Sequence, residues 1–448
     1  MSGRSYFGTD GVRGTAGVFP ITAPFALQLG TAVGETLRVA AQETPLVMLG
    51  MDTRASGPML AHALAAGLTS RGVDVGWLGV LPTPGVSFLT RDFGAHAGIV
   101  ISASHNPYTD NGIKIFNAIG EKLSDEVERT LEALLERLLG GEMLPPVAPE
   151  ALGHVHDASA EIAVYEEHLL SYAPSLEGLH VLVDCAHGAA SDIAPRVFSR
   201  LGGDVQFINT EPDGVNINLQ CGSTYPQALG KQVVAGGFDV GITFDGDADR
   251  ALLVDSRGRL VSGDHMMVIN SLALGVQRIV GTVMTNLGIE HYLREQGVSL
   301  LRSDVGDRYV FELLTEHALP FGGEQSGHLL FLDKAPSGDG MLSALVTLGA
   351  LRQSGRALCD WIDEIPEYPQ VLTNVRVAPQ HKHAIGSHEA VVAAVSRAEA
   401  SLAGTGRVLL RPSGTEPLIR VMVEGKEAEL VHATAADIAS VVKEISAS

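Results

Sequence analysis

Two short polar segments of this chain carry residue types that could do chemistry together. In the first, Ile101-Ser-Ala-Ser-His-Asn-Pro107, the hydroxyl of Ser104 is followed directly by the imidazole of His105. A hydroxyl beside an imidazole, held on a loop, could carry a phosphoryl group or another electrophile covalently. A plain turn is the alternative, because serine and asparagine also bond to nearby backbone. Ser102 is a second candidate hydroxyl in the same segment.

The second segment holds three aspartates at alternating positions, Asp245, Asp247 and Asp249, followed by Arg250. Carboxylates packed this closely repel one another unless a cation lies between them, and oxygen-only ligands favour a hard ion such as Mg²⁺. An EF-hand loop also begins Asp-x-Asp-x-Asp, but it requires glycine at its sixth position and glutamate at its twelfth. Those positions are Arg250 and Ser256 here. We therefore predict one Mg²⁺ per chain instead of an EF-hand or a solvated acidic turn.

Apolar runs flank both segments and indicate strands that end at the polar loops. Elsewhere, a short apolar strand, a polar loop and a helical pattern follow one another three times, starting near residues 46, 181 and 279. Such alternation builds mostly parallel sheets, with ligands at the carboxyl ends of the strands. A mononucleotide-binding Rossmann unit would show the same alternation, but none of the three loops carries Gly-x-Gly-x-x-Gly. We predict an α/β fold.

Breaks in the periodicity divide the chain into four expected domains, at residues 1–153, 154–256, 257–367 and 368–448. The first three are predicted αβ domains with mixed, mostly parallel sheets, and the last is a smaller α+β domain on a hinge. At the end of the first domain, Asp125 to Leu139 is expected to be an amphipathic helix whose charges form a solvated face.

Composition limits the partners and the compartment. The 448 residues include 31 Lys and Arg against 52 Asp and Glu, a formal charge of −21. So acidic a chain argues against nucleic acid and anionic membranes, and an anionic substrate would need local positive charge. With no signal-peptide pattern and no apolar run of about 18 residues, we expect a cytoplasmic protein. The three cysteines lack a Cys-x-x-Cys pair and are expected to be reduced thiols, with Cys185 in the core.

The motifs together resemble the α-D-phosphohexomutases. Ala103-Ser-His-Asn-Pro107 and Asp245-Gly-Asp-Ala-Asp-Arg250 match the family's reactive and metal-binding loops. Gly322-Gly-Glu-Gln-Ser-Gly-His328 resembles its sugar-recognition loop, and Arg411-Pro-Ser-Gly-Thr-Glu-Pro-Leu-Ile-Arg420 resembles its phosphate-binding loop. The resemblance spans the chain, with the motifs in the expected order. Gln325 and the opening Tyr6-Phe-Gly-Thr-Asp-Gly-Val-Arg-Gly14 are most similar to the glucosamine-phosphate branch.

The resemblance implies four domains around a central cleft and gives the motif residues roles. Ser104 would be the phosphorylated nucleophile, and its phosphate would complete the Mg²⁺ shell of the three aspartates. Arg13 and Arg250 would stabilise the transferring phosphoryl group. Taken alone, the segment around Arg13 is more typical of a surface turn. Arg54 in Asp52-Thr-Arg is a weaker candidate outside this core set.

A group that can both take and return a proton is also needed. Lys114 is the first candidate, since a lysine crowded by other cations has a lowered pKa, although a strand lysine is more often exposed to solvent. His105 and His328 are rivals that the sequence does not rank. Glu324 and Ser326 would bind sugar hydroxyls or a 2-amino group. The nonreacting phosphate would bind a turn formed by Arg411, Ser413, Gly414, Thr415 and Arg420.

The implied reaction interconverts glucosamine 6-phosphate and glucosamine 1-phosphate. Glucosamine 1,6-bisphosphate would be its intermediate and activator, and the product would feed UDP-N-acetylglucosamine and cell-wall precursor synthesis. A homodimer is a further expectation. Three alternatives stay open: a phosphomannomutase or phosphoglucomutase, a Mg²⁺-dependent sugar phosphatase that transfers to water, and a non-catalytic sugar-phosphate sensor.

Overall fold

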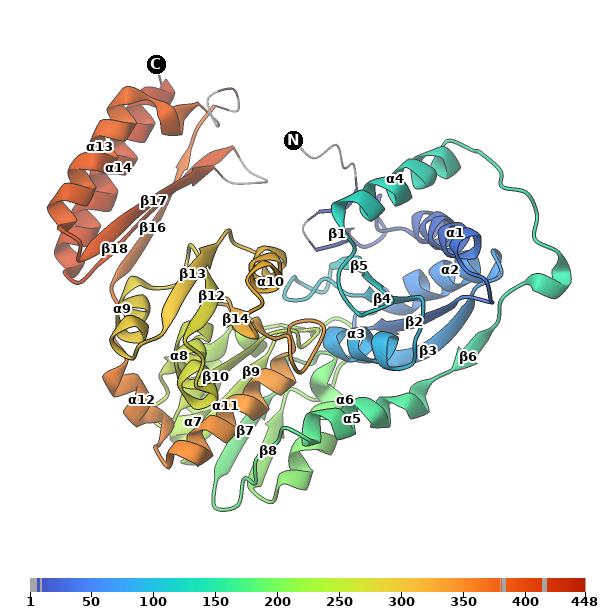
Figure 1. The fold of residues 1–448 in the computed structure, drawn as a ribbon, viewed down its shortest axis with the longest axis horizontal. Coiled ribbons are helices and arrows are strands. Elements are labelled where there is room, and N and C mark those ends of the chain that lie inside the picture. Colours follow the sequence, from blue (N-terminus) through green and yellow to red (C-terminus); the bar gives the residue numbers. More distant parts are fainter. Residues whose placement is uncertain (1–5, 9, 379, 381–383, 413–416, 448) are drawn as a thin grey trace. The chain divides into compact units, whose positions relative to one another are not determined.

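The computed structural model describes residues 6–8, 10–378, 380, 384–412 and 417–447. Two compact units make up the chain, Met1–Val283 with Leu301–Trp361, and Met284–Leu300 with Ile362–Ser448. The described strands form four sheets, and helices pack on each of them (Figure 1). The α/β fold predicted from the sequence is confirmed. Short 3-10 helices lie at Pro149–Ala151, Ser159–Glu161, Ser199–Leu201, Gly222–Thr224 and Ile385–Ser387.

The first sheet has six strands in the order β1-β5-β4-β2-β3-β6. Strands β2, β3, β4 and β6 run parallel to one another, whereas β5 is antiparallel to β1 and β4. Its strands are β1 (Val12–Thr15), β2 (Leu46–Met51), β3 (Asp74–Val80), β4 (Ala97–Ile101), β5 (Asp110–Asn117) and β6 (Val155–Asp157). Its helices are α1 (Ala23–Ala40), α2 (Gly57–Thr69), α3 (Thr83–Asp92) and α4 (Asp125–Leu139).

Strand β4 lies near the middle of this sheet and is buried along its whole length. Its small and β-branched residues suit a strand that is covered on both faces. At Gly98, a Cβ atom would lie 2.2 Å from Oγ1 of Thr90, so the glycine lets α3 pack closely on the strand. The chain leaves the carboxyl end of β4 directly into the loop that contains Ser104, which gives that loop a rigid base.

The second sheet has the order β11-β10-β9-β7-β8. Antiparallel strands β9 and β10 are joined by the loop that holds the three aspartates, as the flanking apolar runs predicted. The strands are β7 (His180–Asp184), β8 (Asp204–Ile208), β9 (Val240–Phe244), β10 (Ala251–Asp255) and β11 (Leu260–Val261). The helices of this region are α5 (Ile162–Leu170), α6 (Ala190–Phe198) and α7 (Pro226–Gly236).

The third sheet has the order β13-β12-β14-β15, and the β14–β15 hairpin carries the loop with Glu324. Its strands are β12 (Arg278–Thr282), β13 (Ser299–Ser303), β14 (Phe321–Gly323) and β15 (Leu329–Phe331). The helices that follow or separate them are α8 (Gly263–Leu274), α9 (Leu287–Glu295), α10 (Asp307–Glu316), α11 (Gly340–Ser354) and α12 (Leu358–Glu364).

The fourth sheet is small and entirely antiparallel, in the order β16-β18-β17. Its elements are β16 (Gln370–Arg376), α13 (Glu389–Leu402), β17 (Gly406–Pro412), β18 (Leu418–Gly425) and α14 (Ala428–Ala447). Helices α13 and α14 lie together on one face of this sheet (Figure 1). This segment is α+β, as predicted for residues 368–448.

Helix α4 occupies the residues predicted for it, but the prediction that its charges are all solvated was wrong. Glu128 and Glu132 are buried. Oε1 of Glu132 accepts hydrogen bonds from the backbone N–H groups of Tyr6 and Phe7, at 2.6 and 2.7 Å. A charged residue on this helix therefore fastens the N-terminal segment, because buried backbone donors need an acceptor.

The cysteines and the helix lengths can be compared with the predictions from the sequence. Cys185 and Cys221 are buried free thiols, and Cys359 is a partly exposed one. Burial raises the pKa of the Cys185 thiol, which agrees with a core position. Within the described residues, no helix is both long enough and apolar enough to cross a bilayer.

Candidate functional site

Hydrogen bonds from Arg54 hold the loop that follows β4. The guanidinium of Arg54 is fully buried and donates to Oδ2 of Asp52 at 2.9 Å. Its remaining N–H groups donate to backbone carbonyl oxygens of the loop, at Ser104, Asn106, Pro107 and Asp110. An arginine has five N–H donors, and all of them are used here. The sequence placed Arg54 outside the core set of site residues, because the short pattern Asp52-Thr-Arg54 does not indicate that the arginine binds a loop some 50 residues away.

Ser104 has a left-handed backbone, with φ of 50°, which a non-glycine residue adopts only where its surroundings enforce it. Its Oγ donates to Oδ2 of Asp245 at 2.6 Å and lies 3.3 Å from Nδ1 of His105. Ser102 is buried, and its hydroxyl has other hydrogen-bond partners. Its Oγ donates to Asp52 at 2.6 Å and accepts from the backbone N–H of Ser104 at 2.9 Å. The geometry therefore favours Ser104 over Ser102 as the reactive hydroxyl.

The three aspartates are buried and come together at one point. Carboxylate oxygens of Asp245, Asp247 and Asp249 lie within 4.8 Å of one another. Burial, followed by the charges of the other two, raises the pKa of Asp245 well above its usual value. Oδ1 of Asp247 and Oδ1 of Asp249 are buried without a hydrogen-bond partner among the described residues. Such orphaned anionic oxygens fit a hard divalent cation.

The aspartate loop and the serine loop touch through their backbones. A Cβ atom at Gly246 would lie 2.7 Å from the carbonyl oxygen of Ser104, so only glycine allows this approach. Nδ2 of Asn218 donates to the same carbonyl at 2.9 Å. Thr83, at the start of α3, donates its hydroxyl to Oδ2 of Asp247 at 2.6 Å. Four segments distant in sequence therefore set the position of Ser104 against the carboxylates.

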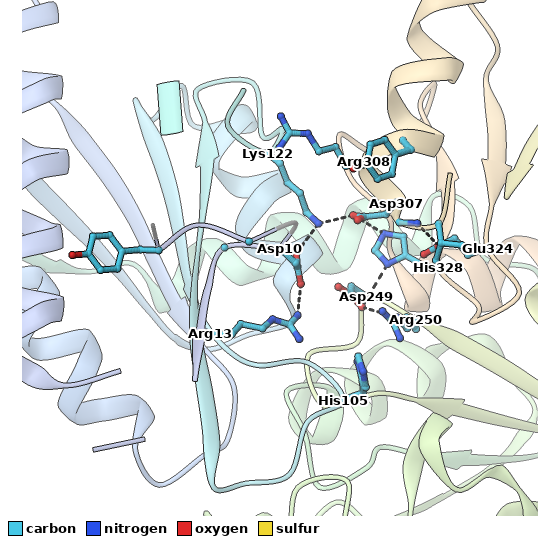
Figure 2. Close-up of a pocket in the computed structure, with 16 residues that line it drawn as sticks. Asp10, Arg13, His105, Lys122, Asp249, Arg250, Asp307, Arg308, Glu324 and His328 are labelled. Atoms are coloured by element: carbon cyan, nitrogen blue, oxygen red, sulfur yellow. Dashed lines mark hydrogen bonds and ion pairs between the residues drawn. The ribbon is translucent and has the colours of Figure 1, made fainter. Parts of the chain in front are cut away.

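A cavity of about 430 Å³ opens beside this cluster (Figure 2). Its walls include six of the residues predicted from the motifs: Arg13, His105, Asp249, Arg250, Glu324 and His328. Ser104, Lys114, Asp245 and Asp247 are buried and are not among the lining residues. Arg13 and Arg250 give the cavity a cationic part near the serine loop.

Lys114 is buried, and its direct contacts are with carboxylates. Its Nζ contacts Asp247 at 2.8 Å, Asp249 at 3.2 Å and Asp10 at 3.3 Å. Burial disfavours its charge, but these carboxylates raise its pKa well above the usual value. The predicted lowering of this pKa was wrong, because β5 points the lysine toward the aspartate loop. Lys114 belongs to the first sheet and the aspartate loop to the second, and the sequence does not reveal that these two sheets meet here.

The two histidines of the cavity wall lie in opposite electrostatic environments. Burial, assisted by Arg250 and Arg13, lowers the pKa of His105 to about 4. Burial also disfavours protonation of His328, but Asp249 and Asp307 raise its pKa to about 9. His328 lies 3.6 Å from Asp249 and 3.5 Å from Asp307. In the geometry described here, His105 is neutral and His328 carries a proton at neutral pH.

Sequence reasoning missed a chain of charges on the cavity wall. Nζ of Lys122 lies 2.6 Å from Asp10 and 2.6 Å from Asp307 (Figure 2). Arg13 pairs with the other oxygen of Asp10. Arg308, the neighbour of Asp307, reaches Asp125 and Glu128 on α4. Asp10 and Arg13 lie in the opening motif, but the motif gave Asp10 no role. Lys122, Asp307 and Arg308 belong to no motif, so only their convergence from the β5–α4 connection and α10 identifies them.

The sugar-recognition loop lies between β14 and β15. Oε1 of Glu324 accepts from the backbone N–H of Gly306 at 2.9 Å, and burial raises the pKa of this carboxyl. The hydroxyl of Ser326 is buried without a hydrogen-bond partner in the described part of the chain. Ser326 is not among the residues that line the cavity.

The predicted phosphate loop belongs to the second unit. Ser413, Gly414 and Thr415 lie outside the described residues. Arg411 on β17 and Arg420 on β18 are directly opposite one another in the antiparallel register. Opposed residues project to the same face of a sheet, so the two cations lie side by side on one face.

Comparison with known protein families shows which family the chain belongs to. Models of the phosphoglucomutase/phosphomannomutase family match alpha/beta/alpha domain I at residues 4–139, domain II at 163–258, domain III at 262–368, and the C-terminal domain at 372–441. The chain is a member of this family.

Curated relatives of this phosphoglucomutase/phosphomannomutase family member extend over its whole length. A phosphoglucosamine mutase from Deinococcus deserti is 53% identical over 443 residues, covering 99% of both chains. Phosphoglucosamine mutases from Deinococcus radiodurans and Thermus thermophilus are 52% and 50% identical and cover 99% and 95% of this chain, and 99% and 94% of their own.

Solved structures share the fold of this family member at low identity. A phosphoglucomutase/phosphomannomutase family protein from Burkholderia thailandensis has a TM-score of 0.78 at 23% identity, covering 97% of both chains. An N-acetylphosphoglucosamine mutase from Aspergillus fumigatus, solved in complex with GlcNAc-6P and magnesium, has a TM-score of 0.67 at 17% identity. It covers 99% of this chain and 96% of its own.

Proposed function

We propose that this chain is a phosphoglucosamine mutase, which interconverts glucosamine 6-phosphate and glucosamine 1-phosphate. The observation that carries the proposal is the 2.6 Å contact between Oγ of Ser104 and Asp245, within a cluster of three buried carboxylates. Full-length relatives at about half identity bear the same activity in their names. A reactive hydroxyl beside an acidic cation site is what transfer of a phosphoryl group requires.

In the proposed reaction, Ser104 carries the phosphoryl group in the resting enzyme. Its O–P bond breaks while a new bond forms to O1 of glucosamine 6-phosphate, and the proton of that hydroxyl ends on Oγ of Ser104. The bound glucosamine 1,6-bisphosphate then turns around, and its O6–P bond breaks as the phosphoryl group returns to Oγ. The proton of Oγ passes to O6, which leaves glucosamine 1-phosphate. The same bisphosphate would reload a dephosphorylated Ser104, which makes it the activator as well as the intermediate.

The cationic part of the cavity suits the charge of the transferring group. Arg250 extends from the aspartate loop, and Arg13 from β1, into the cavity wall. Nε of Arg13 and Nε of Arg250 are buried without hydrogen-bond partners among the described residues. Free guanidinium donors fit the equatorial oxygens of a phosphoryl group, whose charge they stabilise as the O–P bond loosens.

Asp245, Asp247 and Asp249 would hold a Mg²⁺ ion together with an oxygen of the Ser104 phosphate. When bound, the ion would supply neutralisation of the phosphoryl charge. Proton transfer to and from the sugar hydroxyl would fall to Lys114, His105 or His328, all of which surround the same cluster. Single substitutions of these three residues can be compared by their pH–rate profiles. The residue that acts as general acid or base is the one whose substitution removes the acidic or the basic limb of the profile.

Glu324 and Ser326 are proposed to bind the sugar, and Arg411, Ser413, Gly414, Thr415 and Arg420 to bind the nonreacting phosphate. The opposed arginines of β17 and β18 support the second role. A dedicated site for a second phosphate suits an enzyme that must keep its bisphosphate for the return transfer. A phosphatase has no need of one.

A substrate panel tests the proposal. Turnover is compared on glucosamine 6-phosphate, glucose 6-phosphate and mannose 6-phosphate with Mg²⁺ present, while released inorganic phosphate and phosphorylation of the Ser104 peptide are followed by mass spectrometry. We expect the highest kcat/KM on the amino sugar, a phosphopeptide that contains Ser104, and loss of turnover on chelation that Mg²⁺ restores. Preference for a neutral hexose, or phosphate release faster than isomer formation, would overturn the assignment.

A further inference from the structure

Among the described residues, four carboxylates line the cavity, and they differ in how many of their oxygens already have a hydrogen bond or ion pair. Asp10 is saturated, with Lys122 on Oδ1 and with Arg13 and Lys114 on Oδ2. Asp249 belongs to the acidic cluster. Asp307 and Glu324 are different, because each has only one oxygen with a hydrogen bond or ion pair in the described part of the chain. Their second oxygens are free to bind a ligand.

Asp307 is the first residue of α10, and its side chain is 20% exposed. Both of its contacts use Oδ2, with Nζ of Lys122 at 2.6 Å and Nε2 of His328 at 3.5 Å. Lys122 also has Oδ1 of Asp10 at 2.6 Å. A cation that binds Oδ1 of Asp307 therefore need not displace Lys122. Figure 2 shows Asp307 beside His328 on the cavity wall.

The charge of Asp307 distinguishes it from Glu324. Burial alone would raise the pKa of Asp307, but Lys122 and His328 lower it below the usual value. Burial raises the pKa of Glu324, and the nearby charge of Asp307 adds to that effect. Of the two carboxylates with an open oxygen, Asp307 more firmly keeps a negative charge. The backbone N–H of Gly306, next in sequence to Asp307, binds Glu324 at 2.9 Å, so both carboxylates belong to one wall.

We propose that Asp307 binds the 2-ammonium group of the amino sugar and is the residue that makes the site prefer glucosamine phosphates to neutral hexose phosphates. This inference rests on the proposed function. An ammonium group donates a charge-assisted hydrogen bond to the open oxygen, whereas the 2-hydroxyl of glucose offers only a neutral donor. Glu324 can accept from a hydroxyl on a neighbouring ring carbon, since a carboxylate accepts from either kind of donor.

The test separates recognition of the ammonium group from general damage to the site. KM and kcat for glucosamine 6-phosphate are measured together with the inhibition constant of glucose 6-phosphate, for the full chain and for Asp307→Asn. Asparagine keeps an acceptor for Lys122 but removes the charge. We expect KM for glucosamine 6-phosphate to rise roughly tenfold to a hundredfold, and the inhibition constant of glucose 6-phosphate to change less than about threefold.

Glu312→Gln is the matched control, since Glu312 lies on the same helix, is 57% exposed, and contacts Arg308 at 3.3 Å. It should leave both constants unchanged. Asp307→Ser removes the charge in a second way, so that the decision does not depend on the folding of one variant. Equal changes in the two constants, or no change in either, would refute the role of Asp307. If the unaltered chain fails to isomerise glucosamine 6-phosphate, the proposed function fails instead.

Discussion

Two arginines near the reactive loop, Arg54 and Arg250, are used in opposite ways. Arg54 is fully buried and uses all five of its N–H donors on Asp52 and on four carbonyl oxygens of the Ser104 loop. The guanidinium of Arg250 makes no hydrogen bond within the described residues, and its Nε approaches Asp249 only to 3.8 Å. It lines the cavity with its side chain 26% exposed.

The difference shows which cations form the scaffold and which are available to a substrate. A guanidinium whose donors are all satisfied has nothing left for a phosphate, so Arg54 can act only by holding the loop in place. A buried guanidinium N–H without a hydrogen-bond partner costs free energy in the unliganded protein, and it gains a partner when an anion binds. We therefore expect Arg54 to control stability and loop geometry, and Arg250 to control turnover.

The largest expected effect concerns the hydroxyl that the Arg54 scaffold presents. Ser104→Ala should lower turnover at least about 10⁴-fold, because it removes the proposed nucleophile. Ser102→Ala is the matched control. It removes a scaffold contact to Asp52 and should cost about 1–3 kcal/mol of stability while retaining phosphorylation of Ser104. Turnover and phosphopeptide mapping of both variants check this, and an active Ser104→Ala enzyme would contradict the assignment.

Arg54→Gln should lower the free energy of unfolding by about 3–5 kcal/mol, because it leaves the carboxylate of Asp52 buried without its cation. Urea-induced unfolding measures the loss. Arg250→Gln, examined in parallel, should change the same quantity by less than about 1 kcal/mol. Equal losses of stability in the two variants would break the distinction between a scaffold arginine and a substrate-facing arginine.

Arg250→Gln should instead lower kcat by about 10²–10³-fold, equivalent to about 2.7–4 kcal/mol of transition-state stabilisation. The reason is that Arg250 lines the cavity in which the phosphoryl charge is proposed to develop. Steady-state kinetics on glucosamine 6-phosphate provide the measurement. A variant that keeps full kcat while KM alone rises would show that Arg250 contributes uniform binding and not stabilisation of the transition state.

The smallest effect expected is in the pH dependence of stability. Burial already raises the pKa of Asp52, with Arg54 opposing that effect, and Arg54→Gln should raise it further. A carboxyl whose pKa is higher in the folded state binds more protons there, so folding becomes more favourable as the pH falls toward the unfolded value near 4. The stability deficit of Arg54→Gln should therefore shrink by roughly 1–2 kcal/mol between pH 8 and pH 5.

The double variant Asp52→Asn with Arg54→Gln is the control for this pH effect. It has no buried carboxyl at this position, and its stability difference from the unaltered chain should stay nearly constant over the same range. A deficit in Arg54→Gln that grows on acidification would mean that Asp52 is not the titrating group.

Local chemistry and periodicity were enough to predict the elements around the site. The strand before Ser104, the hairpin around the three aspartates and helix α4 lie where their apolar patterns place them, because such patterns report burial along a single element. The motif residues Arg13, His105, Arg250, Glu324 and His328 do converge on one cavity. Their catalytic and binding roles stay predictions, which the variants above test.

Contacts between distant elements could not be predicted. Lys114 was expected among cations and lies among carboxylates, and Glu132 was expected in water and binds backbone N–H groups. Lys122 and Asp307 lie in no motif, and Asp10 lies in the opening motif without a predicted role. A side chain's pKa and its hydrogen-bond partners depend on what the other elements bring near it.

The amino-acid sequence by itself was enough to predict the α/β fold, the clustering of the three aspartates and the candidate hydroxyl of Ser104, because spacing along one segment carries that information. Only the tertiary structure decided which arginine supports the loop and which faces the cavity, and which carboxylate keeps an open oxygen. Those properties depend on how many donors and acceptors meet at one point after folding, and segments distant in sequence supply them. Arg54 lies 50 residues from Ser104, and Lys122 lies 185 residues from Asp307.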